Sequence, residues 1–458
     1  MLVTEIMKYS TDEITKAIAA KVSNNTNGVF IDNDFIGVST DSRSVKSGDL
    51  FFALKGESFD GHRFVEQAIA KGAAGVVVSE DIESDKTIVF KVDDTLKALG
   101  DLASFVRSQY NIKCIAITGS NGKTTTKEIL AACLRLKYNT LKSEGNFNNL
   151  IGVPLSIFQL NETHEAAVFE LGMSYPGEIS RLAQISHPQV GIFTNIAPAH
   201  LESMGSIEAI AKAKRELIDG LPSDGTAVIN VDNQILASWI KDIKQNVITY
   251  GINDDADYRA ENIEITADGS SKFNIKEIQY HLSFPGRHNI YNAVAAIAGA
   301  STLGIGYKEL SDTIDNIKPY KQRSEIFTVG GITIINDCYN ANPESMKAAI
   351  DLLAGYPSAG RRIAVLGDML ELGTNEIDFH KQIGSHLKIK NIDALFAIGK
   401  LAEFYLNNYS NGFKALYKDK TEMAEALKRF LHSGDVVLIK GSRGAVLEKV
   451  TEKLMELK

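Results

Sequence analysis

The segment 112–126 reads IKCIAITGSNGKTTT, and it decides the fold of the middle of the chain. Residues 112–118 form an apolar run of strand length, and the apolar spacing of residues 123–137 predicts a helix. A strand, a glycine-rich turn and a helix in this order are typical of a phosphate-binding loop. Glycines let backbone N–H groups approach phosphate oxygens, the helix N-terminus attracts anions, a lysine reaches the outer phosphates, and a threonine hydroxyl binds Mg²⁺. The predicted nucleotide-binding residues are Gly119, Ser120, Asn121, Gly122, Lys123, Thr124 and Thr125.

The loop departs from the usual pattern Gly-x-x-x-x-Gly-Lys-[Ser/Thr]. The first position of that pattern is Ile117, so the loop is the shorter Gly-x-x-Gly-Lys-Thr. Taken alone, such a match also fits a glycine-rich turn with an incidental lysine. The strand before it and the helix after it favour binding of nucleotide phosphates.

The segments around the loop alternate between strand and helix patterns. Strands alternating with helices indicate a parallel sheet that is covered on both faces. We predict strands at 166–171, 190–195 and 227–231, a helix at 207–221, antiparallel strands within 245–285, and an Ala-rich helix at 288–303.

The two ends of the chain each predict a further α/β unit. Residues 49–54 and 74–78 read as strands, 64–71 as a short helix and 95–110 as a bridging helix. Residues 317–320 read as a linker, after which strands are predicted at 332–336, 362–366, 394–398 and 435–440, with a final helix at 443–457. We therefore expect an α/β protein of three domains: a small α/β N-terminal domain (1–105), a central P-loop ATPase-like parallel-sheet domain (106–319) and a C-terminal Rossmann-like α/β domain (320–458).

Length, composition and cysteine usage are typical of a globular protein of several domains, and we expect it in the cytosol. The chain has 458 residues, and at roughly 100–200 residues per domain it must contain several domains. Its 49 basic and 57 acidic side chains give a net charge of −8, which argues against a nucleic-acid partner. Cys114 and Cys133 lie in apolar runs and are predicted to be buried thiols, and no cysteine pairing typical of metal sites or disulfides occurs. The first residues lack the basic start and apolar core of a signal peptide, and no stretch reaches the ~18 apolar residues of a membrane span, so we expect a cytosolic protein. We expect small-molecule substrates and a monomer.

The segment TGSNGKT at 118–124 resembles the ATP loop of the Mur ligase family, the peptidoglycan amide ligases that include folylpolyglutamate synthase as a relative. Four further segments agree with that family in type and order, namely GNFNNLIGVP (145–154), ELGM (170–173), TNIAPAHL (194–201) and GRHNIYN (286–292). The resemblance covers essentially the whole chain. It implies an ATP-dependent, ADP-forming ligase that activates a carboxylate as an acyl phosphate, which an amine then attacks.

Two C-terminal segments, DCYNANPES (337–345) and LGDMLELG (366–373), resemble the branch of the family that adds D-alanyl-D-alanine to UDP-N-acetylmuramoyl-tripeptide. The sibling that adds the third residue carries Asp-Asn-Pro-Arg, whereas residues 341–344 here read Ala-Asn-Pro-Glu. Residues 40–43 (TDSR) and 59–62 (FDGH) resemble uridine-diphosphate-binding segments. The resemblance also implies two Mg²⁺ sites.

The predicted metal ligands are Thr124, Glu170, His200 and Lys214. Glu170 ends an apolar strand, and ligands bind at the carboxyl ends of parallel strands, although a glutamate there can also cap the next turn. A neutral imidazole suits Mg²⁺ poorly, so the resemblance alone implies that His200 joins the second metal site. Lys214 by itself reads as a solvated helix lysine. The resemblance implies that one lysine of its segment carries a CO₂-derived carbamate, and the context favours Lys214 over Lys212.

The remaining roles also come from the resemblance. Asn289 and Asn292, three residues apart on one helix, are implied to bind adenine, the alternative being helix capping or hydrogen bonds between domains. Arg323 is implied to reach the terminal phosphate, with Asp337 and Asn340 near the ribose or phosphates. These three residues follow the linker, so the site is expected to be complete only when the domains close and exclude water. The expected catalytic set is Lys123, Glu170, His200, Lys214 and Arg323.

The expected substrate-binding residues fall in two groups. Asn146, Asn148 and Asn149 can donate and accept hydrogen bonds and suit a polar muramoyl–peptide, although they also suit a structural loop. Ser42, Arg43, Phe51 and His62 are expected to contact the uridine nucleotide, and Phe51 equally suits the core. Two other functions stay open: a sibling or folylpolyglutamate-type ligase, and a nucleotide switch that ligates nothing. A nucleotide switch would leave the predicted metal ligands without a role.

Overall fold

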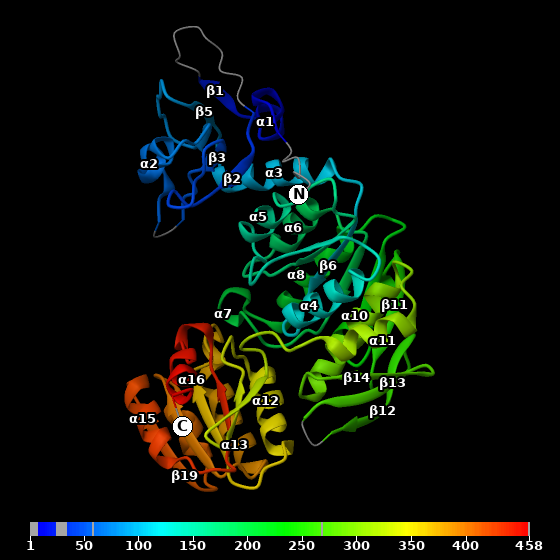
Figure 1. The fold of residues 1–458 in the computed structure, drawn as a ribbon, viewed down its shortest axis with the longest axis vertical. Helices are drawn as coiled ribbons and strands as arrows, with labels where there is room; N and C mark the ends of the chain where they lie inside the picture. The colour runs from blue at the N-terminus through cyan, green and yellow to red at the C-terminus, as the bar shows by residue number, and fades with distance from the viewer. Residues whose placement is uncertain (1–7, 24–33, 57–58, 267–268, 457–458) are drawn as a thin grey trace.

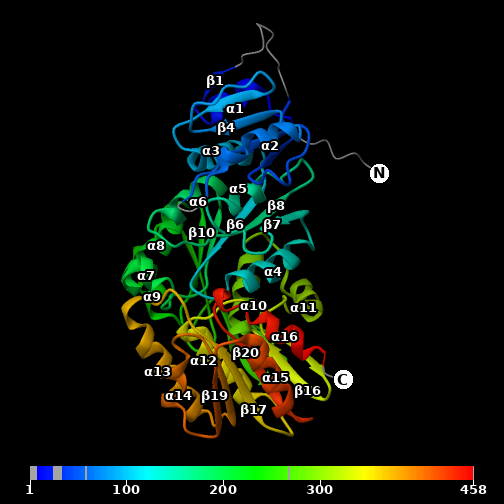
Figure 2. The same ribbon diagram turned by 90° about the vertical axis from the view of Figure 1, so that its left-hand side faces the viewer.

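The computed structural model describes residues 8–23, 34–56, 59–266 and 269–456. Within these residues the chain forms three sheets that follow one another along an elongated molecule, from the N-terminal part at the top of Figure 1 to the C-terminal part at the bottom. Figure 2 shows the same order from the side. The α/β class and the division into three α/β units are confirmed.

The N-terminal sheet is five-stranded, in the order β1-β5-β4-β3-β2, and is parallel except for β1. Helix α3 contacts α5 and α6 of the next unit and so joins the two sheets. The elements are α1 (Thr11–Ala17), β1 (Lys21–Ser23), β2 (Gly37–Ser39), β3 (Asp49–Phe52), η1 (Gly61–Phe64), α2 (Val65–Ala70), β4 (Gly75–Val78), β5 (Ile88–Lys91) and α3 (Thr95–Ser108).

The middle sheet is nine-stranded, in the order β14-β13-β12-β11-β10-β9-β6-β8-β7. Its strands are β6 (Lys113–Thr118), β7 (Thr140–Lys142), β8 (Ala166–Glu170), β9 (Val190–Phe193), β10 (Thr226–Asn230), β11 (Asn246–Gly251), β12 (Tyr258–Ile265), β13 (Ser271–Ile275) and β14 (Ile278–Leu282). Its helices are α4 (Lys123–Leu134), α5 (Gly152–Ile157), α6 (Glu178–Ser186), α7 (Leu201–Met204), α8 (Ile207–Asp219), α9 (Gln234–Trp239), η2 (Ile240–Asp242), α10 (Arg287–Ser301) and α11 (Tyr307–Asn316).

Both faces of the middle sheet are buried, as its apolar strands predict. Along β6, Cys114 and Ala116 pack into one core with α3, α5, α6 and α8, whereas Ile115 and Ile117 pack into a second core with α4 and α10. Successive side chains of a strand point to opposite faces, so a strand buried on both sides reads as an unbroken apolar run. Cys114 and Cys133 are buried free thiols, as predicted.

The prediction of antiparallel strands throughout 245–285 is wrong at its start. β11 is parallel to both β10 and β12, and only β12, β13 and β14 pair antiparallel. β11 follows a helical crossover through α9 and therefore returns in the direction of β10. The chain first reverses between β12 and β13, and it reverses again at the tight turn between β13 and β14, where Lys276 has a φ of +55°.

The C-terminal sheet is six-stranded, in the order β15-β16-β20-β17-β18-β19, with only β15 antiparallel. One face packs on α12, α13 and α14, and the other on α15 and α16. The strands are β15 (Glu325–Val329), β16 (Ile332–Asn336), β17 (Arg362–Gly367), β18 (Ala394–Ile398), β19 (Phe413–Tyr417) and β20 (Val436–Lys440). The helices are α12 (Pro343–Gly355), η3 (Gly373–Asn375), α13 (Glu376–Ile389), α14 (Ala402–Asn408), α15 (Lys420–Phe430), η4 (Arg443–Ala445) and α16 (Glu448–Leu454).

The final helix is shorter than the predicted 443–457. A single 3₁₀ turn, η4, comes first, and Val446 then has a left-handed φ of +51°, so α16 begins only at Glu448. A left-handed residue cannot continue a right-handed helix. Residue 457 lies outside the described residues. Among those described, no helix is both long and apolar enough to cross a bilayer.

Candidate active site

The phosphate loop joins the carboxyl end of β6 to α4, as predicted. Gly119 and Gly122 have φ values of +150° and +81°. A Cβ at Gly119 would overlap Thr194 Oγ1, and one at Gly122 would overlap Asn292 Oδ1, so both positions require glycine. No side chain caps α4, which leaves its first N–H groups available to an anion. Lys123 Nζ donates to Gly119 O at 2.8 Å, across the loop that phosphates would fill.

Glu170, at the end of β8, connects the phosphate loop to the asparagine loop. Its side chain is buried, and its Oε2 accepts the hydroxyl of Thr124 at 2.8 Å. Its Oε1 accepts Asn148 Nδ2, also at 2.8 Å. Burial lowers the pKa of Lys123, and the negative charge of Glu170 opposes that shift. A carboxylate, a hydroxyl and a lysine therefore meet beside the phosphate loop.

Lys214 lies on α8 with 2% of its surface exposed, whereas Lys212 is exposed. Burial lowers the pKa of Lys214 well below its ordinary value, and the positive charge of Lys123 adds to the shift. A neutral amine is the form that can attack CO₂. If one of these two lysines carries a carbamate, the burial favours Lys214 over Lys212.

His200 contacts the C-terminal unit. Its backbone is left-handed, with φ at +55°, and its Nδ1 lies 2.5 Å from Glu371 Oε2. The backbone N–H of Glu202 donates to Glu371 O at 3.1 Å. The loop before His200 is fixed to the phosphate loop, because Ser120 Oγ donates to Ala197 O at 2.8 Å. One ring nitrogen of His200 is thus engaged across the boundary between the two units.

Arg323 is the only predicted catalytic residue that comes from beyond the linker. Its Nη2 donates to Thr124 Oγ1 at 3.2 Å, and its guanidinium lies 3.8 Å from the centre of the Tyr339 ring. The described structure gives Arg323 Nε no partner, although that atom is buried. Buried polar groups are normally paired, so this atom is available to a bound anion.

Asp337 and Asn340 are tied together by Lys440, which sequence reasoning missed. Lys440 Nζ lies 2.5 Å from Asp337 Oδ2 and donates to Asn340 O at 2.9 Å. Ser324 N donates to Asp337 Oδ1 at 3.1 Å. A signal was present, because Lys440 ends the apolar strand 435–440 at the sheet edge where ligands bind.

The two predicted adenine residues lie on α10, beside the phosphate loop. Asn292 Oδ1 accepts Thr126 Oγ1 at 3.4 Å, and its Nδ2 donates to Asn289 Oδ1 at 2.9 Å. Asn289 Nδ2 donates to Pro285 O at 2.8 Å. Asn292 is therefore against the loop, whereas Asn289 is turned toward the start of its own helix.

A second missed contact joins the phosphate loop to α12, which lies beneath α10 in Figure 2. Asn342 Nδ2 donates to Asn121 Oδ1 at 2.7 Å, and Asn195 Nδ2 donates to Glu344 Oε2 at 3.3 Å. The middle and C-terminal units are thus docked directly at the phosphate loop.

Of the asparagine-loop residues, only Asn148 reaches the predicted metal ligands. Asn149 Oδ1 accepts Gly152 N at 2.8 Å and so shapes the turn into α5, which favours the structural alternative for this residue. Asn146 is exposed.

The four residues predicted to contact the uridine nucleotide differ in their exposure to solvent. Phe51 is 1% exposed and packs in a core with residues of α2, which favours the core alternative for this residue over a contact with uridine. His62 is also buried, with Nδ1 2.7 Å from Asp60 Oδ1 and Nε2 accepting Ser79 N at 2.9 Å. Ser42 Oγ donates to Gln67 Oε1 at 2.8 Å. Arg43 is exposed and paired with Asp41.

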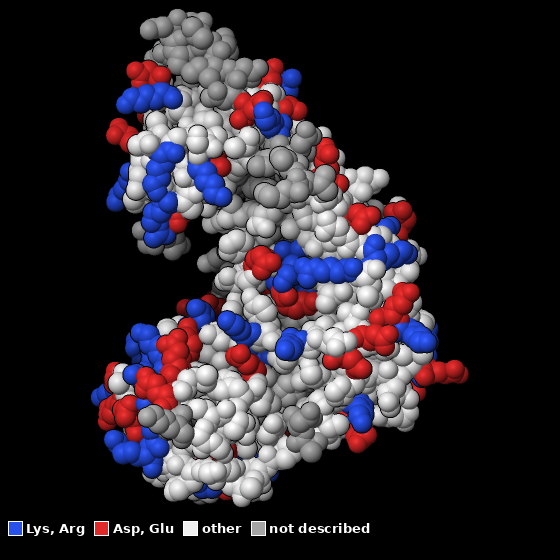
Figure 3. All heavy atoms as spheres, in the orientation of Figure 1, with Lys and Arg blue, Asp and Glu red and all other residues white. Residues whose placement is uncertain are grey.

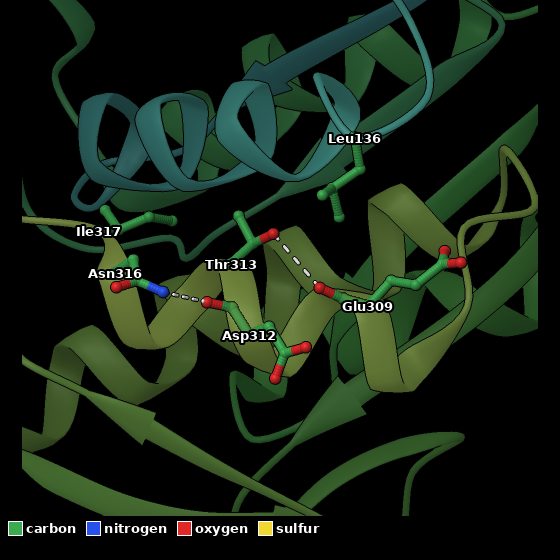
Figure 4. Close-up of a pocket in the computed structure, with 6 residues that line it drawn as sticks. All are labelled: Leu136, Glu309, Asp312, Thr313, Asn316 and Ile317. Atoms are coloured by element: carbon green, nitrogen blue, oxygen red, sulfur yellow. Dashed lines mark hydrogen bonds between the residues drawn. The ribbon is translucent and has the colours of Figure 1, made fainter.

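A surface depression between α4 and α11 is unrelated to these residues. Figure 4 shows its lining, which consists of Leu136, Glu309, Asp312, Thr313, Asn316 and Ile317. Its Asn316 and Thr313 side chains donate to backbone carbonyls of their own helix. None of its lining residues belongs to the predicted site.

We expect replacement of Glu371 by alanine to loosen the docking of the C-terminal unit. The hydrogen bond from His200 holds the pKa of Glu371 below its ordinary value. Because the side chains of His200 and Glu371 are 32% and 58% exposed, we expect this pair to contribute only about 0.5–1 kcal/mol to the docking free energy. Its loss should raise the ratio of open to closed molecules about two- to five-fold. Single-molecule energy transfer between dyes on the middle and C-terminal units would measure the shift. Glu202→Ala, which removes a nearby charge but keeps the contact, should change nothing; equal effects of both variants would contradict the assignment.

Comparison with known proteins agrees with this geometry. Residues 34–107 match the family model "Mur ligase family, catalytic domain", residues 117–300 "Mur ligase middle domain" and residues 322–443 "Mur ligase, glutamate ligase domain". The UDP-N-acetylmuramoyl-tripeptide–D-alanyl-D-alanine ligase of Bacillus subtilis is 39% identical over 92% of this chain and 93% of its own length. The ligase of the same name from Escherichia coli is 38% identical over 92% and 93%.

Solved structures give the same result. A MurF structure from Acinetobacter baumannii matches with a TM-score of 0.91 and 31% identity, covering 98% of this chain and 99% of that one. The MurF ligase of Thermotoga maritima, solved in complex with ADP, matches with a TM-score of 0.82 and 30% identity, covering 92% and 97%. With a phosphate loop, a buried carboxylate and a buried lysine in one place, and relatives of this identity over nearly its whole length, the chain belongs to the Mur ligase family.

Proposed function

We propose that this chain uses ATP to join D-alanyl-D-alanine to UDP-N-acetylmuramoyl-tripeptide, giving ADP, phosphate and UDP-N-acetylmuramoyl-pentapeptide. The observation that carries the proposal is the pair of hydrogen bonds on Glu170, which brings the phosphate loop and the asparagine loop to one carboxylate. A ligase needs this proximity, because the terminal phosphate must reach the acceptor carboxylate. The names of the relatives and the segments 337–345 and 366–373 support the choice of substrates.

The donor set fits magnesium. Thr124 and Glu170 offer a hydroxyl and a carboxylate 2.8 Å apart beside the phosphate loop, and Mg²⁺ prefers oxygen ligands. A carbamate on Lys214 would replace a buried amine by an oxygen ligand, and Lys214 is close enough to Glu170 for the two charges to interact. His200 fits a second site less directly, since its Nδ1 is engaged by Glu371 and only Nε2 remains. Bound Mg²⁺ would neutralise charge that develops on the phosphates.

Each remaining residue acts by position and charge. Lys123 and Arg323 carry positive charge to the two sides of the phosphate loop and would stabilise the transferring phosphoryl group. Asn148 orients Glu170 and is placed to contact the acceptor. Asn292 would bind adenine, with Asp337, held by Lys440, near the ribose or phosphates. Docking of α12 on the loop would exclude water from the acyl phosphate.

The three units divide the substrates. We assign the uridine nucleotide to residues 1–105, ATP to 106–319, and the incoming dipeptide and the closure over ATP to 320–458. Figure 3 shows the surface hollowed between the N-terminal and C-terminal units, with Lys and Arg side chains on the N-terminal side, which suits a long anionic substrate reaching the phosphate loop. Exposed Arg43 suits that role better than buried His62. A cytosolic monomer stays our prediction.

The test is phosphate release from ATP by purified enzyme with Mg²⁺ and bicarbonate. We expect release to require both UDP-N-acetylmuramoyl-tripeptide and D-alanyl-D-alanine, and mass spectrometry to show the pentapeptide. Release with single amino acids but not with the dipeptide would move the protein to a sibling ligase. Release indifferent to every acceptor would support a nucleotide switch and overturn the proposal.

A further inference from the structure

Lys127 is a fully buried lysine that the proposed reaction leaves without a role. It lies on α4 one turn after Lys123, and it is 0% exposed. A buried ammonium is costly unless several groups compensate its charge, so the fold must gain something from this placement.

The partners of Lys127 lie in one turn of the backbone. Its Nζ donates to Ser143 O at 2.6 Å and to Gly145 O at 3.3 Å, and Glu128 Oε1 lies 3.2 Å away. Lys142, at the end of β7, pairs with the other oxygen of Glu128 at 2.6 Å. The lysine therefore connects the helix that follows the phosphate loop to the turn 143–145.

That turn leads directly into the asparagine loop. Glu170 N donates to Ser143 Oγ at 3.3 Å, so the same turn is fixed to the strand that carries the buried carboxylate. Gly172 N then donates to Asn148 O at 2.7 Å, and Asn148 Nδ2 donates to Glu170 Oε1. Moving the turn away from α4 would move Asn148 away from Glu170 and from Thr124.

We propose that Lys127 is a positioning residue for ligation, which holds the acceptor-side asparagine loop at a fixed distance from the phosphate loop. Lys127 does not touch substrate. It acts through the Ser143 and Gly145 carbonyls on Asn148, and so sets the alignment of the acceptor carboxylate with the terminal phosphate. This inference rests on the proposed ligase function.

The test variant is Lys127→Met, which keeps the length of the side chain but leaves the two carbonyls without their donor. A misalignment near 1 Å costs about 10²-fold in rate, so we expect kcat to fall by that order and KM for the UDP-tripeptide to rise several-fold. The dissociation constant of ADP, measured by calorimetry, should stay within about two-fold, because the loop itself is intact. Lys137→Met, which removes an exposed lysine bonded to Gly304 O beyond the end of α4, should leave all three unchanged.

The decisive measurement is the number of phosphates released per pentapeptide formed. We expect one in the wild type and more than one in Lys127→Met, because a misaligned acyl phosphate is lost to water. The inference is overturned if Lys127→Met releases one phosphate per pentapeptide and keeps the KM for the UDP-tripeptide unchanged. It is also overturned if ADP binding weakens as much as binding of the UDP-tripeptide. If circular dichroism shows that Lys127→Met is unfolded, Lys127→Arg, which keeps the charge but displaces the turn, must show the same raised ratio. If the wild-type enzyme forms no pentapeptide, the proposed function itself is wrong.

Discussion

Replacement of Lys214 by alanine should lower kcat by about 10³-fold while the protein stays folded. The side chain is buried, and its charge interacts with those of Lys123 and Glu170. Burial lowers the pKa of the Lys214 amine, which favours the neutral form that takes up CO₂. Under the proposed function, alanine would remove the carbamate and with it one oxygen ligand of the metal. Folding should survive, because the change removes a buried amine whose charge the site disfavours. Steady-state phosphate release and a thermal melt would measure both effects.

The matched control for this variant is Lys212→Ala, since Lys212 lies on the same helix but is exposed. We expect it to keep wild-type activity. Carbon-13 spectra recorded with labelled bicarbonate should show a carbamate resonance in the wild type and in Lys212→Ala, and none in Lys214→Ala. Loss of activity and resonance in Lys212→Ala, with both kept in Lys214→Ala, would reverse the assignment; full activity in both variants would remove the carbamate from the mechanism.

Replacement of Glu170 by glutamine should lower kcat by about 10²–10³-fold and weaken Mg²⁺ binding. Glutamine keeps the volume and one oxygen acceptor, so the bonds from Thr124 and Asn148 can partly persist. The negative charge is lost, which would remove the proposed metal ligand. Lys123 also loses the charge that opposes the lowering of its pKa. The affinity for Mn²⁺, followed by electron paramagnetic resonance with ADP present, would measure the metal effect apart from turnover.

The control for that variant is Asn149→Ala, which alters the same neighbourhood without touching the carboxylate. Asn149 shapes the turn into α5, whereas it is Asn148 that donates to Glu170, so we expect Mn²⁺ affinity close to the wild type. Unchanged Mn²⁺ affinity in Glu170→Gln would exclude this carboxylate as a metal ligand.

Two buried lysines show a signal that the sequence contained and that our reading did not use. On α8, Lys214 shares the buried side with Ile210, Leu217 and Ile218. On α4, Lys127 shares the buried side with Leu130 and Leu134. A lysine at an apolar position of a helical repeat is not solvated, and this pattern alone marks both residues as buried.

The sequence by itself determined the local elements and the order of the chemistry along them. Apolar runs of strand length followed by helical repeats predicted the sheets, because burial on one or both faces imposes a period that neighbouring residues share. The glycines of the phosphate loop and the carboxylate that ends β8 could be predicted as site residues because they lie directly at the ends of these strands. For Phe51, the apolar run 49–54 agrees with the burial that the structure shows, whereas the expected contact with uridine came from the resemblance alone.

Only the tertiary structure decided which distant residues meet. Thr124 and Arg323 are separated by 199 positions, Asn121 and Asn342 by 221, and His200 and Glu371 by 171. No period of a helix or strand carries information over such separations. These contacts arise because parallel sheets collect the carboxyl ends of non-adjacent segments at one edge, and because two such edges then dock on each other.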